Sequence, residues 1–161
     1  MVTGIVIPHD ITKALQKVEF QNLADYQAAV GGYIETIQLD DHPLLIVANE
    51  EGKIGRLPLN ERATCLWWLL NPAGLGGDEL VGDVVLLGPI KRGEITSAPE
   101  KIVALILESK RFQVQVRLSQ EFDTWVPIGK LVDDFFEATL RALRLMEVWS
   151  PPGDVNVVAS E

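Results

Sequence analysis

A glycine pair and a nearby carboxylate are the first residues whose types could do chemistry. Gly31 and Gly32 stand directly before an alternating segment, residues 33–39, which also carries Glu35. Two adjacent glycines let a ligand approach the backbone, because no Cβ atom stands in the way. A small anionic ligand would suit this place, and Glu35 would then face its pocket. A helix end followed by a solvated Glu35 is the structural alternative.

A second polar segment, residues 49–53, follows an apolar run and has the sequence Asn-Glu-Glu-Gly-Lys. This is turn chemistry, and it predicts a hairpin into a strand over residues 54–57. The functional alternative places Asn49 at the mouth of a pocket, where its amide would hydrogen-bond a ligand. If the protein is an enzyme, Glu50 or Glu35 would be its general base.

The third segment is the start of a predicted helix. Asn60 precedes Glu61 and Arg62. The first N–H groups of a helix and the positive end of its dipole can hold an anion, and Arg62 could add a bidentate contact to a phosphate. An ordinary N-cap at Asn60 with Arg62 on the surface is the structural alternative.

Patterns for metal binding, nucleophilic catalysis and phosphate loops are missing from the sequence. His9 and His42 each lie beside a proline, and no HxxxH or CxxC spacing accompanies them. Cys65 lies in an apolar run, which is typical of a buried small hydrophobe. No serine lies in a nucleophile-elbow context. We therefore expect no metal and no cofactor.

The composition restricts the partners and the compartment. The chain has 161 residues and a formal net charge of −9. Such a surface repels nucleic acid phosphates and anionic lipids, so we expect no direct nucleic-acid binding and no membrane association. It could instead bind a basic protein surface or imitate DNA. A single cysteine and the lack of a signal peptide at the start of the chain favour the cytoplasm.

The order of elements predicts an α+β fold with a mixed, mainly antiparallel sheet, two or three short helices and one long C-terminal amphipathic helix. The predicted helices before residue 90 span residues 23–30, capped by Asn22, and 61–70. The predicted strands before residue 90 are residues 4–7, 14–19, 33–39, 44–48 and 81–87. Residues 1–90 would form this core.

Residues 91–149 would pack on the same core, with the most plausible internal boundary over residues 88–99. Residues 102–107 fit helix and strand equally. Residues 112–118 alternate and predict a strand that forms a hairpin with residues 124–126. Residues 128–148 predict the long helix, and residues 150–161 a mobile tail.

Large aromatic residues suggest an interface. Trp67 and Trp68 are adjacent, so one helix cannot turn both of them toward a single core. Phe135 and Phe136 belong to the apolar stripe of the long helix. We count these four residues as a candidate interface with another element or with a second subunit in a homodimer.

Four blocks of sequence carry a family resemblance. They are residues 30–35 (VGGYIE), 47–53 (VANEEGK), 57–63 (LPLNERA) and 81–85 (VGDVV). Together they resemble an uncharacterised family of small domains from bacteriophages, plasmids and integrated elements of bacteria. The resemblance covers roughly residues 4–90 and implies an accessory gene of a mobile element. Residues 23–26 with 32–35 are also similar to a stretch of acidic antirestriction proteins that mimic DNA.

The sequence therefore favours a non-enzymatic binding protein in the cytoplasm of the bacterial host. It would counteract host defence by capturing a host protein or a small anionic, nucleotide-like ligand. The candidate ligand-binding residues are Gly31, Gly32, Glu35, Asn49, Glu50, Asn60 and Arg62. The alternatives are an acidic DNA mimic that inhibits a restriction enzyme and an enzyme acting on nucleotides.

Overall fold

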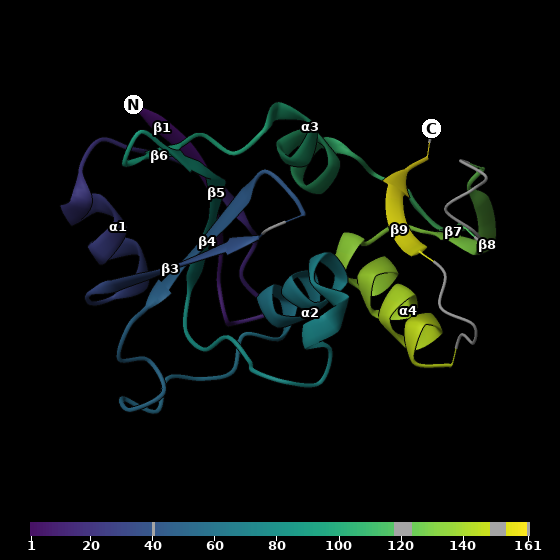
Figure 1. The fold of residues 1–161 in the computed structure, drawn as a ribbon, viewed down its shortest axis with the longest axis horizontal. Helices are drawn as coiled ribbons and strands as arrows, with labels where there is room; N and C mark the ends of the chain where they lie inside the picture. Colours follow the sequence, from purple (N-terminus) through teal and green to yellow (C-terminus); the bar gives the residue numbers. More distant parts are fainter. Residues whose placement is uncertain (40, 118–123, 149–153, 161) are drawn as a thin grey trace. The chain divides into compact units, whose positions relative to one another are not determined.

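A computed structural model describes residues 1–39, 41–117, 124–148 and 154–160. The chain divides into two units (Figure 1). Unit 1 comprises residues 1–64 and 76–103, and unit 2 comprises residues 65–75 and 104–161. The chain passes from one unit to the other three times, so residues 65–75 lie in unit 2 although unit 1 surrounds them in sequence.

A mainly antiparallel sheet forms the centre of unit 1. Its strands follow the spatial order β2-β1-β5-β4-β3, and β6 pairs with β5. Every pairing given for these strands is antiparallel. With the helices described below, this sheet confirms an α+β fold. The strands are β1 Val2–Ile7, β2 Gln16–Phe20, β3 Ile34–Leu39, β4 Leu44–Asn49, β5 Val84–Lys91 and β6 Glu94–Thr96.

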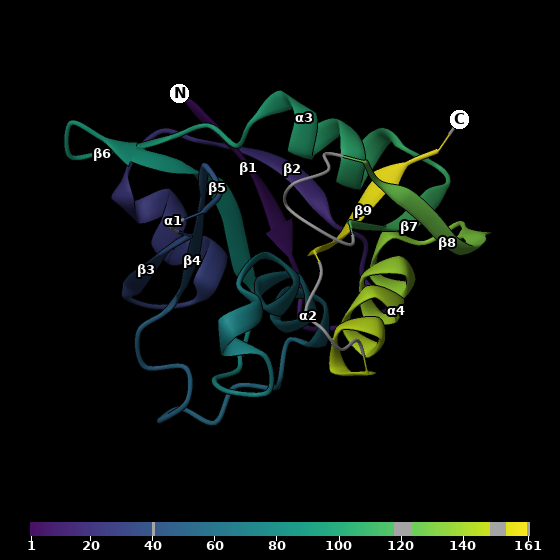
Figure 2. The ribbon, with the colours of Figure 1, turned by 45° about the vertical axis from the view of Figure 1, so that its right-hand side comes forward.

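Helix α1, Leu23–Val30, lies against one face of this sheet (Figures 1 and 2). Asn22 caps its first turn, because the Asn22 side chain accepts a hydrogen bond from the N–H of Asp25. Tyr26 stacks on Phe20 with a centroid distance of 4.7 Å. The core under the helix contains Phe20, Tyr26, Val30, Leu45, Val47, Val85 and Leu87. The sequence predicted this helix with the same bounds.

Strand β4 lies between β5 and β3, which explains its unbroken apolar sequence. Residues 44–48 are all buried, on both faces of the sheet. A strand buried on both faces shows no alternation, so a continuous apolar run predicts it. The prediction of a buried strand over residues 44–48 is confirmed.

The expected boundary over residues 88–99 falls inside unit 1. Strand β5 continues to Lys91 and turns back into β6. Helix α3, Glu100–Val103, is followed by a π-helical turn, Ala104–Glu108, and the division between the units falls between them. The apolar run over residues 102–107 is thus helical.

Unit 2 contains a three-stranded antiparallel sheet and a helix. The strands, in the spatial order β8-β7-β9, are β7 Phe112–Arg117, β8 Val126–Val132 and β9 Asp154–Ala159. Helix α4, Phe135–Val148, packs on β7 and β9. Phe135 is buried edge-to-face against Phe112, with a centroid distance of 5.5 Å. This contact places Phe135 in the core of unit 2.

The long C-terminal helix starts later than predicted. Residues 128–132 belong to β8 and not to the helix, and Gly129 has a φ of 77°. The carboxylate of Asp134 accepts a hydrogen bond from the N–H of Phe136 at 2.7 Å, which caps the helix at this point. The helix has 14 residues.

The predicted mobile tail contains regular structure. Residues 154–159 form β9, which pairs with β7 along its length. Residues 150–153 and 161 of the tail lie outside the described part of the chain, and so does residue 118 of the predicted strand. Among the described residues, no helix has both the length and the apolar character needed to cross a membrane.

Candidate functional site

The glycine pair ends helix α1 and leaves no free backbone donor. Gly31 has a φ of 80°, the left-handed conformation that glycine adopts at a helix end without steric cost. The N–H groups of Gly31 and Gly32 both donate to the carbonyl of Gln27, at 2.8 and 3.1 Å. Because both amides are used inside the protein, the pair cannot offer them to an anion.

Asn49 joins the glycine pair to the loop after β4. Its Nδ2 atom donates to the carbonyl of Val30 at 3.2 Å, and its Oδ1 atom accepts from the N–H of Glu51 at 2.9 Å. A Cβ atom on Gly32 would lie 2.9 Å from Asn49 Nδ2, so any larger residue would displace this amide from its present place. Asn49 therefore stabilises the end of α1 and the start of the next loop together.

The loop 50–57 is irregular, so the predicted hairpin strand over residues 54–57 is wrong. Its backbone turns on itself, with the N–H of Gly55 donating to Glu51 and that of Leu57 to Gly52. The Lys53 ammonium pairs with the carboxylate of Asp78. The backbone hydrogen bonds within the loop give these N–H groups partners without a neighbouring strand.

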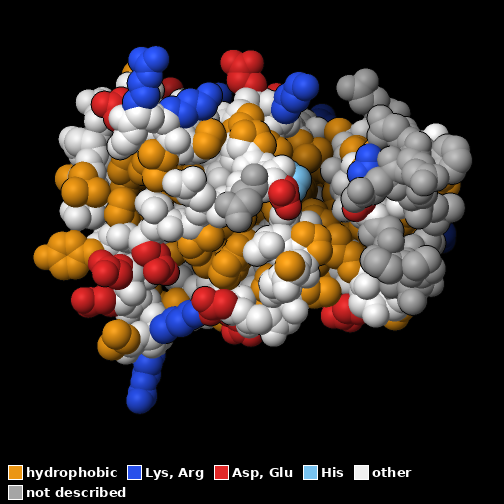
Figure 3. All heavy atoms as spheres, viewed as in Figure 1, with side chains coloured by type: hydrophobic (Ala, Val, Ile, Leu, Met, Phe, Trp, Pro, Cys, Tyr) orange, Lys and Arg blue, Asp and Glu red, His pale blue; other side chains and the backbone are white. Residues whose placement is uncertain are grey.

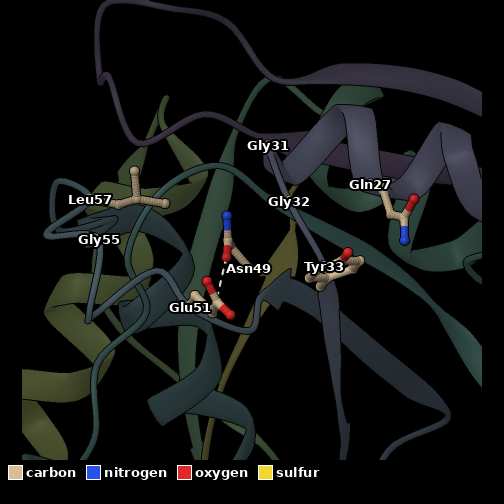
Figure 4. A pocket seen from close by; sticks show the side chains of 8 residues that line it. All are labelled: Gln27, Gly31, Gly32, Tyr33, Asn49, Glu51, Gly55 and Leu57. Atoms are coloured by element: carbon tan, nitrogen blue, oxygen red, sulfur yellow. Dashed lines mark hydrogen bonds between the residues drawn. The ribbon is translucent and has the colours of Figure 1, made fainter.

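A hollow of about 450 Å³ lies between the end of α1, Asn49 and loop 50–57 (Figure 4). We call it the Tyr33 hollow after the Tyr33 side chain on its wall. This side chain is 67% exposed. Figure 4 shows Tyr33 beside Gln27, with Asn49 between the glycine pair and Glu51. The lining residues are Gln27, Gly31, Gly32, Tyr33, Asn49, Glu51, Gly55 and Leu57.

Charged side chains of both signs surround the Tyr33 hollow, since Lys53 and Arg56 are exposed on loop 50–57. Glu51 is the one charged residue among those that line the hollow. Two further carboxylates are exposed nearby, Glu35 on β3 and Glu50 just after β4. Figure 3 shows Asp and Glu side chains gathered at the left of the view, beside a protruding hydrophobic side chain. Neither Glu35 nor Glu50 lines the hollow. The structure thus brings Gly31, Gly32 and Asn49 of the predicted site together.

Asn60 is fully buried and serves as a staple, contrary to its predicted role in ligand binding. Its Nδ2 atom donates to the carbonyls of Ile7 and Gly82, both at 2.8 Å. Its Oδ1 atom accepts from the N–H of Ala63 at 3.0 Å and so caps helix α2, Glu61–Leu70. With an exposure of 0%, Asn60 cannot contact a ligand in solution.

Arg62 is likewise used inside unit 1. Its Nη2 atom donates to the carbonyls of Pro8, Asp10 and Lys13, at 2.7 to 3.0 Å. These contacts fix the connection between β1 and β2. Two hydrogen bonds from Thr12, by its hydroxyl and its N–H, lower the pKa of the Asp10 carboxyl in the same connection. The side chains predicted to hold an anion at the start of α2 thus bond to backbone carbonyls of unit 1, and the anion site itself stays a prediction.

The predicted interface residues lie in unit 2. Trp67 and Trp68 on α2 are half-buried, and so is Phe136, which makes an edge contact with Phe135 at 5.2 Å. The homodimer remains a prediction. In the described part of the chain, no group of three or more His, Cys, Asp or Glu side chains is arranged to hold a metal ion.

Sequence reasoning missed five of the lining residues, which are Gln27, Tyr33, Glu51, Gly55 and Leu57. A signal for Tyr33 was present, because an aromatic residue directly after two glycines stands outside the helix and just before β3. Leu57 gave no local signal, since its place in the hollow depends on the fold of loop 50–57.

Comparisons with known proteins identify the family. No curated protein and no solved structure matches the chain. The family DUF3846, a domain of unknown function, matches residues 2–111. The match includes all four sequence blocks and extends beyond the expected residue 90 through β6 and α3. The chain therefore belongs to the DUF3846 family.

Proposed function

We propose that this protein is a non-enzymatic binding protein of a phage or other mobile element, which captures a host protein and so blunts host defence. The observation that carries the proposal is the Tyr33 hollow, whose lining includes both an exposed aromatic ring and a carboxylate. The mobile-element context comes from the resemblance of the four sequence blocks.

The hollow suits a basic side chain of a partner protein better than a small anion. An aromatic face attracts a Lys or Arg cation, and a carboxylate beside it adds charge attraction. Tyr33 and Glu51 supply this pair of groups. An anion would meet the negative charge of Glu51, and the Gly31 and Gly32 amides are engaged by Gln27.

The alternatives have weaker support. Glu35 and Glu50 do not line the hollow, so neither is positioned as a general base for a ligand there. A DNA mimic needs a continuous acidic surface, whereas Lys53 and Arg56 follow Glu51 on the same exposed loop. The captured partner is therefore better described as a protein with a basic surface.

Affinity capture from the bacterial host tests the proposal. The full chain would be immobilised as wild type, Tyr33→Ala, Glu51→Gln and Glu94→Gln, and bound proteins identified by mass spectrometry. We expect a host protein whose capture falls roughly tenfold, about 1.4 kcal/mol, with Tyr33→Ala or Glu51→Gln. Glu94→Gln removes an exposed charge on β6 and should leave capture unchanged.

Thermal melting with a panel of nucleotides and cyclic nucleotides tests the small-anion version. We expect the melting temperature to stay constant, because the backbone amides of Gly31 and Gly32 already bond to Gln27 and the carboxylate of Glu51 would repel an anion. A nucleotide that raises the melting temperature of wild type but not of Tyr33→Ala would contradict the proposal, as would capture that ignores both hollow variants.

A further inference from the structure

Strand β3 forms one edge of the sheet of unit 1, and its pairing with β4 fixes which backbone groups point outward. The N–H of Glu50 donates to the carbonyl of Tyr33 at 2.8 Å, so these two residues form a hydrogen-bonded pair. In an antiparallel ladder such pairs alternate with pairs that share no hydrogen bond. In this register Glu35 and Ile37 bond to β4, and Ile34, Thr36 and Gln38 turn their N–H and C=O groups away from it.

This outer edge carries few of the features that protect edge strands. Proline, lysine and β-bulges are the usual protection. None of them occurs in β3, whose sequence is Ile-Glu-Thr-Ile-Gln-Leu and whose pairing with β4 is regular. Among the described residues, no backbone group outside the sheet hydrogen-bonds to the backbone of Ile34, Thr36 or Gln38. The three residues therefore present a row of donors and acceptors.

Acidic side chains accompany the open edge. Tyr33 and Glu50 face each other across the ladder, and Glu35 lies two residues from Tyr33 on the same face. Glu51 lies on the wall of the adjoining hollow. No Lys or Arg occurs in residues 30–52. An added strand with a cation at every second residue would place its positive charges beside these carboxylates.

We infer that β3 binds an extended basic segment of the partner protein as an additional antiparallel or parallel strand, with a Lys or Arg side chain in the Tyr33 hollow. This rests on the proposed function, since it names how the captured protein is held. Main-chain hydrogen bonds to Ile34, Thr36 and Gln38 give affinity, and the alternate cations give specificity.

A second copy of the chain is a less suitable occupant. Pairing of β3 with β3 of another copy would bring two acidic strands together, each on a chain with a formal net charge of −9. Like charges on neighbouring strands destabilise a pair. Charge complementarity therefore selects a basic segment of a different protein.

Amide hydrogen exchange of the full chain with a synthetic peptide tests the inference. The probe is a blocked heptapeptide that alternates lysine and threonine. Its control is the same peptide N-methylated on those alternate residues whose N–H groups face β3, which keeps the charges and removes the strand donors. Two such control peptides are measured, one N-methylated on the odd residues and one on the even residues.

We expect exchange at Ile34, Thr36 and Gln38 to slow at least roughly tenfold with the unmodified peptide, because their N–H groups gain partners. Glu35 and Ile37 should not change, since they already bond to β4. One of the two N-methylated peptides should lose this protection and the other should keep it.

Three results would overturn the inference. The first is that the peptide does not bind. The second is that all three peptides bind equally and the outward amides are not protected. The third is that these amides become protected without peptide as the protein concentration rises. The last would make a second copy the occupant. If any of them occurs while Tyr33→Ala still lowers capture, the edge inference fails and the proposed function stands. If Tyr33→Ala has no effect on capture, the proposed function fails as well.

Discussion

The Tyr33 hollow and the start of helix α2 carry similar residues but have opposite roles. Each combines an asparagine with a helix end, and the sequence suggested an anion site at both. At the start of α2, the side chains of Asn60 and Arg62 donate hydrogen bonds to backbone carbonyls of unit 1. At the hollow, Asn49 also bonds to the backbone, yet Tyr33 and Glu51 beside it stay exposed.

The difference shows that burial separates a staple from a binding surface when residue types do not. Asn60 has an exposure of 0% and three side-chain hydrogen bonds, so its bonding capacity is met almost completely inside the fold. A buried asparagine of this kind acts on stability. An exposed ring such as that of Tyr33 contributes little to stability and is free to act on a partner.

Replacing Asn60 should have the largest effect on the free energy of unfolding. Asn60→Ala leaves the buried carbonyls of Ile7 and Gly82 without this donor and removes the cap of α2. We expect the free energy of unfolding to fall by about 3 kcal/mol, measured by urea denaturation. Asn22→Ala, which removes an exposed cap of α1, should cost only about 1 kcal/mol. Equal costs would break the distinction between buried and exposed asparagines.

The glycine pair comes next. Gly32→Ala forces a Cβ atom against the Asn49 amide, and we expect a loss of about 1 to 2 kcal/mol in the same denaturation experiment. A double-mutant cycle sharpens the cause. In an Asn49→Ser background the smaller side chain relieves the clash, so Gly32→Ala should cost clearly less. An unchanged cost would place the strain elsewhere.

Arg62→Lys should have a smaller, local effect. A lysine cannot reproduce the fork of the guanidinium, so the carbonyls of residues 8–13 lose part of their support. We expect a loss of about 1 kcal/mol and faster amide exchange in residues 8–13. Arg56→Lys, on the exposed loop, serves as the control. If Arg62→Lys binds phosphate more weakly than wild type and Arg56→Lys does not, the interpretation of this helix start as an anion site would be supported instead.

Tyr33→Ala should have the smallest effect on stability. The ring is 67% exposed, so we expect the free energy of unfolding to change by less than about 0.5 kcal/mol while partner capture falls. Chemical denaturation and capture are measured on the same preparation. A large loss of stability would mean that the ring supports the fold, and the contrast with Asn60 would disappear.

Local signals in the sequence were sufficient for the elements whose causes are local. Helix α1 was predicted with its bounds, because Asn22 and Gly31 cap it from adjacent positions. Strand β4 was predicted from its apolar run. The start of α4 was missed, since residues 128–132 fit a helical stripe as well as a strand, and the cap at Asp134 was overlooked.

Roles that depend on distant partners could not be predicted from the sequence. Arg62 bonds to Pro8, 54 positions away, and Asn60 bonds to Ile7, 53 positions away. Neither spacing leaves a periodic trace. The same limit applies to Leu57, which joins the hollow only through the fold of its loop. The glycine pair and Asn49 were recognised, but their bonds to Gln27 and Val30 remove the anion chemistry that the sequence suggested.

The place of β5 in the sheet has a consequence for synthesis on the ribosome. It lies between β1 and β4, yet it begins at Val84, after both of these strands have been made. If the pairs β1–β2 and β3–β4 form before β5 is made, each has an apolar inner edge without its neighbour strand. Such edges favour association between unfinished chains. Fast elongation through residues 50–91 would shorten this exposure, so synonymous codons that slow translation there should lower the yield of soluble protein.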